Sequence, residues 1–367
     1  MKVMVVAGTR PEIIKLIPVV KRLREDSAIE TVFCMTGQHR EMAQHVLDVF
    51  DVRADVELNL MSENQTLTGL SAAILTGMQP VLSDLKPDWL LVQGDTTTVM
   101  AAALAAFYNR VRVGHVEAGL RSYRKWAPYP EEINRRIAGV VADLHFAPTS
   151  GARDNLLAEG VAPNQVHVTG NTVIDALHLA AELPFELARS PLSEIPFDGQ
   201  EIITITAHRR ENFGKPLENI CAALRRLAEK YDSRVHLVYP VHLNPQVRNV
   251  VSAELGGIRN ITLLDPLDYL SMVQLMKRSK LILTDSGGLQ EEAPGLGVPV
   301  FVLRDVTERP EGVASGNVRM VGTEIETIVR ETSRVLDDER ERLKMASAVN
   351  PYGDGHAAER IAALLKR

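Results

Sequence analysis

The sequence is poor in cysteine, in aromatic residues and in long apolar runs. Its 367 residues include only Cys34 and Cys221, and aromatic residues make up 5% of the chain. Two cysteines exclude a disulfide framework and a zinc site built on cysteine pairs, and they favour a reducing cytoplasm. The longest run without a charged residue, 64–83, contains too many polar residues for a membrane span, and the apolar start of the chain ends at Gly8, too early for a signal peptide.

The chain also has no excess of positive charge. It carries 41 Lys and Arg residues against 47 Asp and Glu residues, a formal net charge of −6. This balance argues against a general surface for nucleic acid or for an anionic membrane, so an anionic small ligand would need a local basic pocket. The length predicts two domains, at about 150 residues per domain.

Short runs of Val, Ile and Leu alternate with helical patterns along the chain. The runs are apolar nearly throughout, as expected for parallel strands that are covered on both faces. A first series of expected strands covers 3–7, 31–36, 89–93, 111–116, 145–147 and 166–169, and a second covers 202–206, 235–239, 261–264, 281–284 and 298–303. The expected helices of the first series lie at about 11–25, 40–50, 66–85, 96–109, 131–141 and 149–159.

This alternation predicts an α/β protein with two Rossmann-like, doubly wound domains. We expect the first domain at residues 1–170 and the second at 171–350. Residues 351–367 read as a C-terminal helix that packs back on the first domain. In open parallel sheets ligands bind beyond the carboxyl ends of the strands, so the loops after the strands are the candidate sites.

The loop after the first strand, 8–12, has the composition of an anion site. Gly8 permits a tight turn, the following helix N-terminus attracts negative charge, and Arg10 and Lys15 add cations. A plain turn with surface cations explains the pattern equally well. The loop lacks the full glycine pattern of a dinucleotide-binding fingerprint.

Three carboxylates of the first domain stand at strand ends or helix starts. Asp95 could serve only as a helix cap, Glu117 could form a structural ion pair with Arg121, and Glu131 suits the first turn of a helix. A buried Glu at a strand end nevertheless needs a partner, which favours a site at Glu117. Together the three could transfer protons on either face of a substrate.

The second domain offers cations and backbone donors. His208 is followed by two arginines at a strand end, which indicates an anion site, although a lone histidine is more often structural. The strongest phosphate signal is 284–293, where a strand leads through Ser-Gly-Gly into a helix, so that backbone N–H groups can approach phosphate oxygens. The alternative there is a glycine-lined turn capped by Ser286. Glu292 lies one turn into the helix, where it could hold a ribose diol, and the charged loop at 304–311 could close on a ligand or be solvated.

Seven loops in order resemble one family, the bacterial non-hydrolysing UDP-N-acetylglucosamine 2-epimerases. The resemblance covers essentially the whole chain and rests on 8–12 (GTRPE), 93–96 (QGDT), 115–121 (HVEAGLR), 130–135 (PEEINR), 208–212 (HRREN), 285–292 (DSGGLQEE) and 307–311 (TERPE). It implies a glycosyltransferase B-type fold with the ligand in a cleft, a homodimer, no metal and no nicotinamide cofactor. It also implies reversible epimerisation at carbon 2 of UDP-N-acetylglucosamine to UDP-N-acetylmannosamine, by elimination of UDP to a glycal and re-addition.

The resemblance also assigns roles to residues of this sequence. It implies catalytic roles for Asp95, Glu117, Glu131 and His208. It implies that substrate is bound by Arg10, Lys15, Met272, Ser286, Gly287, Gly288, Glu292 and Arg309. Bacterial members often bind a second substrate molecule as an activator, which here would contact Gln38, Glu41, Asn64, Glu131, Arg210 and His242.

The sequence departs from the family pattern at three of these positions. Met272 stands where a Phe is common in the uracil pocket, although a thioether can pack on a ring. Glu41 and Asn64 replace Gln and Arg, and the loss of a cation at 64 would weaken an anionic activator. The alternatives are an epimerase for a modified UDP-sugar of the diacetamido uronic acid type, a glycosyltransferase of the same fold, and a non-catalytic nucleotide-sugar sensor.

Overall fold

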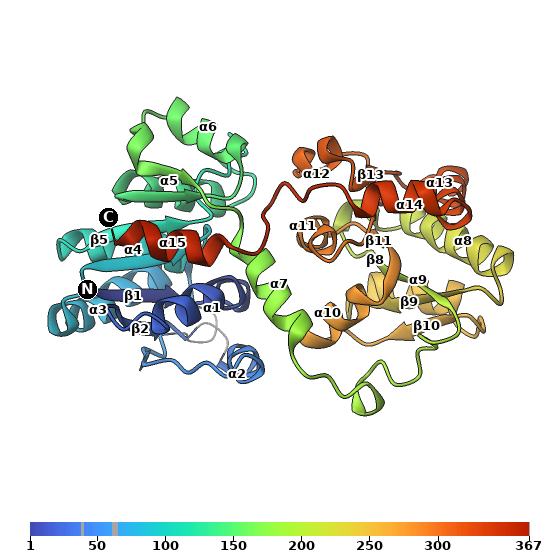
Figure 1. Cartoon of the computed structure of the whole chain (residues 1–367), viewed down its shortest axis with the longest axis horizontal. Helices are drawn as coiled ribbons and strands as arrows, with labels where there is room; N and C mark the ends of the chain where they lie inside the picture. Colours follow the sequence, from blue (N-terminus) through green and yellow to red (C-terminus); the bar gives the residue numbers. More distant parts are fainter. Residues whose placement is uncertain (38–39, 61–64, 367) are drawn as a thin grey trace. The chain divides into compact units, whose positions relative to one another are not determined.

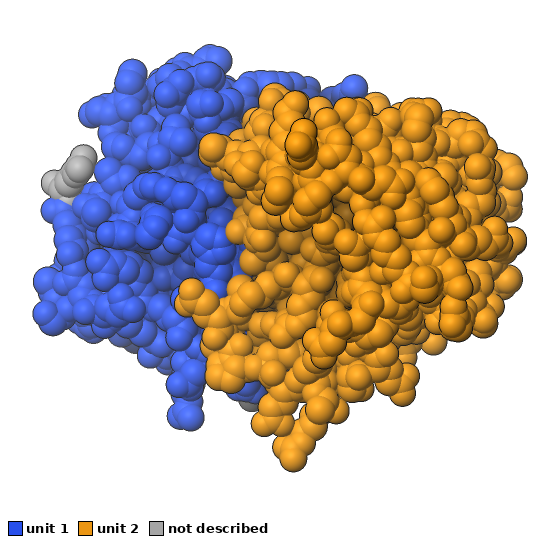
Figure 2. All heavy atoms as spheres, turned by 45° about the vertical axis from the view of Figure 1, so that its right-hand side comes forward, with its two compact units in different colours: residues 1–179, 352–367 blue, residues 180–351 orange. Residues whose placement is uncertain are grey.

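The computed structural model describes residues 1–37, 40–60 and 65–366. The chain divides into two compact units: unit 1 contains residues 1–179 and 352–367, and unit 2 contains residues 180–351 (Figure 2). Each unit is built on its own parallel sheet with helices on both sides (Figure 1). No helix among the described residues is long and apolar enough to span a membrane.

Unit 1 contains a seven-stranded sheet in the order β3-β2-β1-β4-β5-β6-β7. Its strands are β1 (Lys2–Ala7), β2 (Glu30–Met35), β3 (Val56–Glu57), β4 (Trp89–Gln93), β5 (Arg112–Val116), β6 (Leu144–Ala147) and β7 (Val166–Val168). Its helices are α1 (Arg10–Arg24), α2 (Arg40–Val49), α3 (Leu67–Leu85), α4 (Thr97–Tyr108), α5 (Glu131–Val141), α6 (Ser150–Ala158) and α15 (Ala357–Leu365). Helix α7 (Thr172–Glu182) starts in this unit and continues into unit 2.

Unit 2 contains a six-stranded sheet in the order β10-β9-β8-β11-β12-β13. Its strands are β8 (Glu201–Thr206), β9 (Val235–Pro240), β10 (Ile261–Leu264), β11 (Ser279–Thr284), β12 (Val300–Val302) and β13 (Val318–Met320). Its helices are α8 (Lys215–Lys230), α9 (Pro245–Leu255), α10 (Tyr269–Lys277), α11 (Gly287–Gly295), α12 (Pro310–Ser315), α13 (Ile325–Asp337) and α14 (Glu339–Ala346). The prediction of two parallel α/β sheets is therefore confirmed.

Alternating strand residues bury both faces of each sheet. In unit 1, Met4 and Val6 of β1 pack with α3 and α4, while Val3 and Val5, which alternate with them along the strand, are also fully buried. This two-sided burial explains why the strands read as continuous apolar runs. The sequence did not predict β3 and β13, because each is an edge strand of two or three residues and too short for a periodic signal.

Caps at the helix starts position the loops that precede them. The Thr96 hydroxyl accepts a hydrogen bond from the Val99 N–H at α4, and Thr149 does the same for Ala152 at α6. Threonine is among the residue types preferred at this position, because its hydroxyl satisfies a backbone N–H of the first helical turn. Helix α15 contacts α1, and the backbone N–H groups of its first residues donate to the buried carboxylate of Asp175 on α7.

Candidate functional site

A buried carboxylate, Glu12, joins two loops at the carboxyl edge of the unit 1 sheet. One of its oxygens accepts the N–H groups of Gly8 and Thr9 at 2.8 and 2.5 Å, and the other accepts the hydroxyl of Thr96 at 2.5 Å. Burial raises its pKa, and these hydrogen bonds act in the opposite direction. The signal for this role in the sequence is the Thr-x-x-Glu pattern of Thr9 and Glu12, which is typical of a capping box, and Glu12 was not among the predicted site residues.

Glu117 lies just beyond the end of β5 in a backbone conformation that side chains seldom adopt. Its φ is +60°, and one oxygen of its carboxylate lies 2.5 Å from Nζ of Lys15 and 2.7 Å from Nε2 of Gln93. The expected structural pair with Arg121 is replaced by other pairs, because Arg121 binds Glu159. A strained backbone that is held by two donors is typical of functional positions.

Asp95 follows β4 and forms an ion pair with Arg135 of α5. It does not cap α4, since Thr96 takes that position. Glu131 is the first residue of α5, one helical turn before Arg135 and on the same face. One oxygen of Glu131 is buried without a hydrogen-bond partner among the described residues. The structure thus places Asp95 and Glu131 beside one helix face, through an arginine that the sequence analysis did not single out.

His115 of β5 is a structural histidine. Its ring is buried, its Nε2 lies 2.7 Å from the carbonyl oxygen of Gly94, and burial lowers its pKa to about 4. It is therefore neutral at physiological pH and stabilises the turn between β4 and Asp95.

In unit 2, the loop after β8 is held by Asp285, which follows β11. One oxygen of Asp285 accepts the backbone N–H groups of His208 and Arg209 at 2.8 and 2.7 Å, and also the side-chain amide of Asn212 at 3.0 Å. The His208 ring stacks on His242, with centroids 5.1 Å apart and planes inclined by 11°. Burial lowers the pKa of His208, the Asp285 carboxylate raises it, and His242 and Arg209 lower it further.

The Ser-Gly-Gly turn forms the N-terminus of α11, as the sequence predicts. Ser286 occupies the N-cap position, as the capping alternative expects, but its side chain makes no capping hydrogen bond. A Cβ on Gly287 would lie 3.7 Å from Nη2 of Arg209, and one on Gly288 would lie 3.2 Å from Oε1 of Glu292. Glycines, a guanidinium and a carboxylate therefore meet at one helix N-terminus, where backbone N–H groups favour an anion.

The loop between β12 and α12 is tied to α11. Arg309 forms an ion pair with Glu291, and its N–H donates to the Thr307 hydroxyl at 3.0 Å, which in turn donates to Gln290 at 2.6 Å. Earlier in this loop Arg304 pairs with Glu211 and Glu308, which lowers the pKa of Glu308 to about 2. The loop is thus not simply a solvated segment, and Glu291 is a further residue that the sequence analysis did not assign.

The remaining residues that the sequence predicts for the site lie on other elements or outside the described part of the chain. Arg10 is the first residue of α1, Arg210 is exposed in a short 3-10 helix, and Met272 of α10 packs partly buried against a hydrophobic cluster that contains Leu275. Gln38 and Asn64 lie outside the described residues, and Glu41 lies in α2 among residues whose side chains are not described. Among the described residues, no group of three or more His, Cys, Asp or Glu side chains could hold a metal ion.

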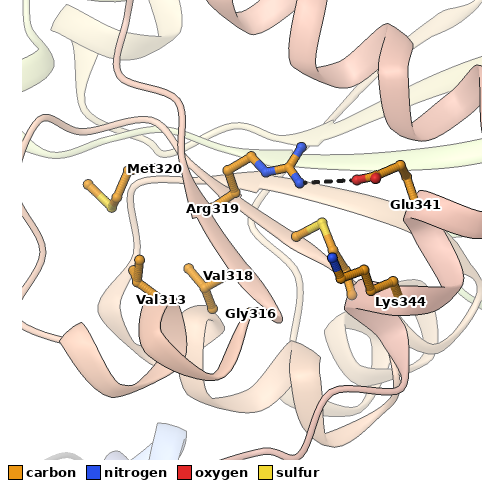
Figure 3. Close-up of a pocket in the computed structure, with 8 residues that line it drawn as sticks. Val313, Gly316, Val318, Arg319, Met320, Glu341 and Lys344 are labelled. Atoms are coloured by element: carbon orange, nitrogen blue, oxygen red, sulfur yellow. Dashed lines mark ion pairs between the residues drawn. The ribbon is translucent and has the colours of Figure 1, made fainter.

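A cavity of about 450 Å³ lies elsewhere in unit 2, among α12, β13 and α14 (Figure 3). Val313 and Val318 line it, and Arg319 and Glu341 form an ion pair at 3.5 Å on its wall. None of the predicted site residues lines this cavity, so it is distinct from the candidate site.

Comparison with known proteins identifies the family. The family model described as UDP-N-acetylglucosamine 2-epimerase matches residues 21–366. The chain belongs to this family. Curated members include the UDP-N-acetylglucosamine 2-epimerase of Yersinia pestis, 51% identical, and that of Escherichia coli K12, 50% identical, each aligned over 100% of this chain and 98% of the relative.

Solved structures agree with the family assignment. The UDP-GlcNAc 2-epimerase from Neisseria meningitidis bound to UDP-GlcNAc is 47% identical, with a TM-score of 0.86 and all of both chains covered. A glycosyltransferase of kitacinnamycin shares the fold at 13% identity, with a TM-score of 0.67 over 100% of this chain and 98% of its own. This likeness shows a shared fold alone.

Proposed function

We propose that this chain is a non-hydrolysing UDP-N-acetylglucosamine 2-epimerase that interconverts UDP-N-acetylglucosamine and UDP-N-acetylmannosamine. The observation that carries the proposal is the family match along the whole chain, which includes a relative of known structure bound to UDP-GlcNAc. The described groups suit the reaction, since unit 1 offers carboxylates for proton transfer and unit 2 offers donors for a diphosphate.

The chemistry requires both kinds of group. Carbon 2 of the sugar is weakly acidic, because no carbonyl group activates it. Loss of its proton can be coupled to departure of UDP from carbon 1, which leaves a glycal. UDP then adds back while a proton is delivered to the opposite face. One carboxylate must serve each face, and the departing diphosphate must be stabilised by cations and N–H donors.

We assign proton transfer to Asp95, Glu117 and Glu131. Glu117 is supported by its fixed orientation, because the side chains of Lys15 and Gln93 both donate to one oxygen of its carboxylate. Asp95 is supported by its ion pair with Arg135, which orients the carboxylate.

We assign the UDP moiety to unit 2. The N–H groups at Ser286, Gly287 and Gly288 and the dipole of α11 suit the phosphates, and His208 suits the charge that develops on the leaving group. Glu292, one turn into α11, suits the ribose diol. Met272 as a uracil contact, and Arg10, Lys15 and Arg309 as phosphate or sugar contacts, remain predictions.

The decisive experiment is incubation with UDP-N-acetylglucosamine in heavy water, followed by NMR at carbon 2. We expect deuterium at carbon 2 together with the manno epimer. Bound ligand without exchange would refute the epimerase and favour a sensor. Transfer of the sugar to an acceptor would favour a glycosyltransferase, and exchange with only a modified UDP-sugar would favour the uronic acid alternative.

Variants connect this activity to the site. Asp95→Asn and Glu117→Gln should each lower turnover by about 10²–10⁴-fold, which is the usual contribution of proton transfer by a positioned group. Asp154→Asn is the matched control, because Asp154 is an exposed carboxylate of unit 1 that pairs with its neighbour Arg153. Near-normal turnover in both site variants would remove these carboxylates from the mechanism.

The homodimer and the second, activating UDP-N-acetylglucosamine molecule are further proposals that rest on the family resemblance alone. Light scattering should give twice the chain mass of 40.5 kDa. Activation predicts a sigmoidal response to UDP-N-acetylglucosamine and stimulation of the reverse reaction. A hyperbolic response with no such stimulation would refute the activating site.

A further inference from the structure

Asp285 is fully buried and uses only one of its two carboxylate oxygens to hold the loop after β8. That oxygen, Oδ2, accepts three hydrogen bonds, two from the backbone at His208 and Arg209 and one from the Asn212 amide. These bonds fix where the loop leaves the sheet. They leave the second oxygen, Oδ1, without a structural task.

The second oxygen faces the imidazole of His208. Oδ1 of Asp285 is buried without a hydrogen-bond partner among the described residues, and it lies 3.7 Å from Nδ1 of His208. A carboxylate oxygen that is buried without a hydrogen bond lowers the stability of the fold, so its presence here calls for a functional explanation. Catalytic hydrogen bonds are often long without substrate and shorten when it binds.

We propose that Asp285 is a positioning residue that keeps the proton of His208 on Nδ1 and so presents Nε2 to the diphosphate of the substrate. The hydrogen bond that one imidazole nitrogen makes decides the state of the other nitrogen. Neutral His208 would then offer Nε2 as an acceptor, and protonated His208 would donate from Nε2 to a phosphate oxygen. This inference rests on the role proposed above for His208.

The charges around His208 make Asp285 the group that favours its protonation. Burial lowers the pKa of His208 most. The pKa is lowered further by the stacked ring of His242, which follows β9, and by the guanidinium of Arg209, which neighbours His208 on the loop after β8. Among the described residues that shift the pKa of His208, only Asp285, whose carboxylate follows β11, raises it. Loss of this carboxylate therefore leaves no opposing contribution.

The variant Asp285→Asn tests the inference with little change in shape. Its amide oxygen can still accept the three hydrogen bonds from the loop, while its NH₂ group would face Nδ1 of His208 and donate to it. The tautomer should therefore change from Nδ1–H to Nε2–H. In full-length protein labelled with ¹⁵N-histidine, with His208→Asn used to assign the signal, long-range ¹H–¹⁵N NMR distinguishes the two tautomers directly.

We expect the Asp285→Asn protein to show the Nε2–H tautomer and a titration of His208 at lower pH than in the wild type. Its kcat/KM at neutral pH should fall by about 10²-fold or more, because loss of the carboxylate disfavours the protonated imidazole that stabilises the departing diphosphate. The pH at which kcat/KM declines should move in the same direction as the NMR titration.

Asn212→Ala is the control, since it removes a donor to the same Asp285 oxygen and keeps the carboxylate. It should weaken the loop but leave the His208 tautomer as in the wild type. An unchanged tautomer and titration in Asp285→Asn, or a tautomer change in Asn212→Ala, would overturn the inference. Because the NMR readout needs no turnover, it decides the positioning role even if the heavy-water experiment rejects the epimerase.

Discussion

Replacement of Gly119 by alanine tests whether a close backbone contact holds the loop that carries Glu117. Gly119 has a φ of +90°, and a Cβ there would overlap the carbonyl oxygen of Ala152 and lie 2.8 Å from its carbon. Ala152 lies in the first turn of α6, so the obstacle is backbone that cannot rotate away. Gly160 has nearly the same φ, +89°, and a Cβ there would meet nothing within 4 Å among the described residues.

The two glycines separate the cost of backbone strain from the cost of overlap. An alanine in the left-handed region costs about 1–2 kcal/mol, and both variants carry that term. Overlap in a packed region adds about 1–3 kcal/mol, which only Gly119→Ala carries. We therefore expect the free energy of unfolding to fall by about 1–2 kcal/mol in Gly160→Ala and by about 2–5 kcal/mol in Gly119→Ala.

Urea unfolding followed by tryptophan emission measures the difference in stability between the two variants in unit 1, which contains both glycines. Both tryptophans, Trp89 and Trp126, lie in unit 1, so their emission reports the unfolding of that unit without a contribution from unit 2. Gly119→Ala should also lower turnover, since displacement of Glu117 by about 1 Å can cost about 10²-fold. Equal losses of stability within about 0.5 kcal/mol would refute the contact with Ala152.

Three further predictions concern charged and titratable groups. Burial raises the pKa of Glu12, so its contribution to the free energy of unfolding is fully present below pH 4.5, its ordinary value, and is lost as pH rises through the raised pKa. The stability advantage of wild type over Glu12→Gln should therefore shrink as pH rises above 4.5, in urea titrations followed by tryptophan emission. Cys34 and Cys221 are buried with pKa values of about 12, so a thiol reagent at pH 8 should modify neither in native protein and both after denaturation. Arg135→Met should lower kcat more than it changes KM in the epimerase assay, because Arg135 orients Asp95.

Each of these has a contrary outcome. A stability difference that is constant or grows with pH would refute the raised pKa of Glu12. Rapid modification of a native cysteine would show that its surroundings open to solvent. A change in KM alone in Arg135→Met would assign that arginine to substrate binding, and Arg136→Met, which alters a half-exposed neighbour, provides the control.

The amino-acid sequence alone was sufficient to predict the two sheets and most of their strands. Buried parallel strands require uninterrupted apolar runs, and runs such as 89–93 match the observed strand. The Ser-Gly-Gly turn at 286–288 was also predictable, because a strand, two glycines and a helix start are local features. The loops that carry Asp95, Glu117 and His208 followed from the same logic, since ligands bind where parallel strands end.

What the sequence determined by itself was therefore the elements and the loops that carry chemistry, because both depend on local pattern. Only the tertiary structure decided which charge meets which. Lys15 and Glu117 are 102 residues apart, Asp95 and Arg135 are 40 apart, and His208 and Asp285 are 77 apart. Such pairs depend on the order of strands in a sheet, which brings distant strand ends together and is not encoded in the spacing of residues along the chain.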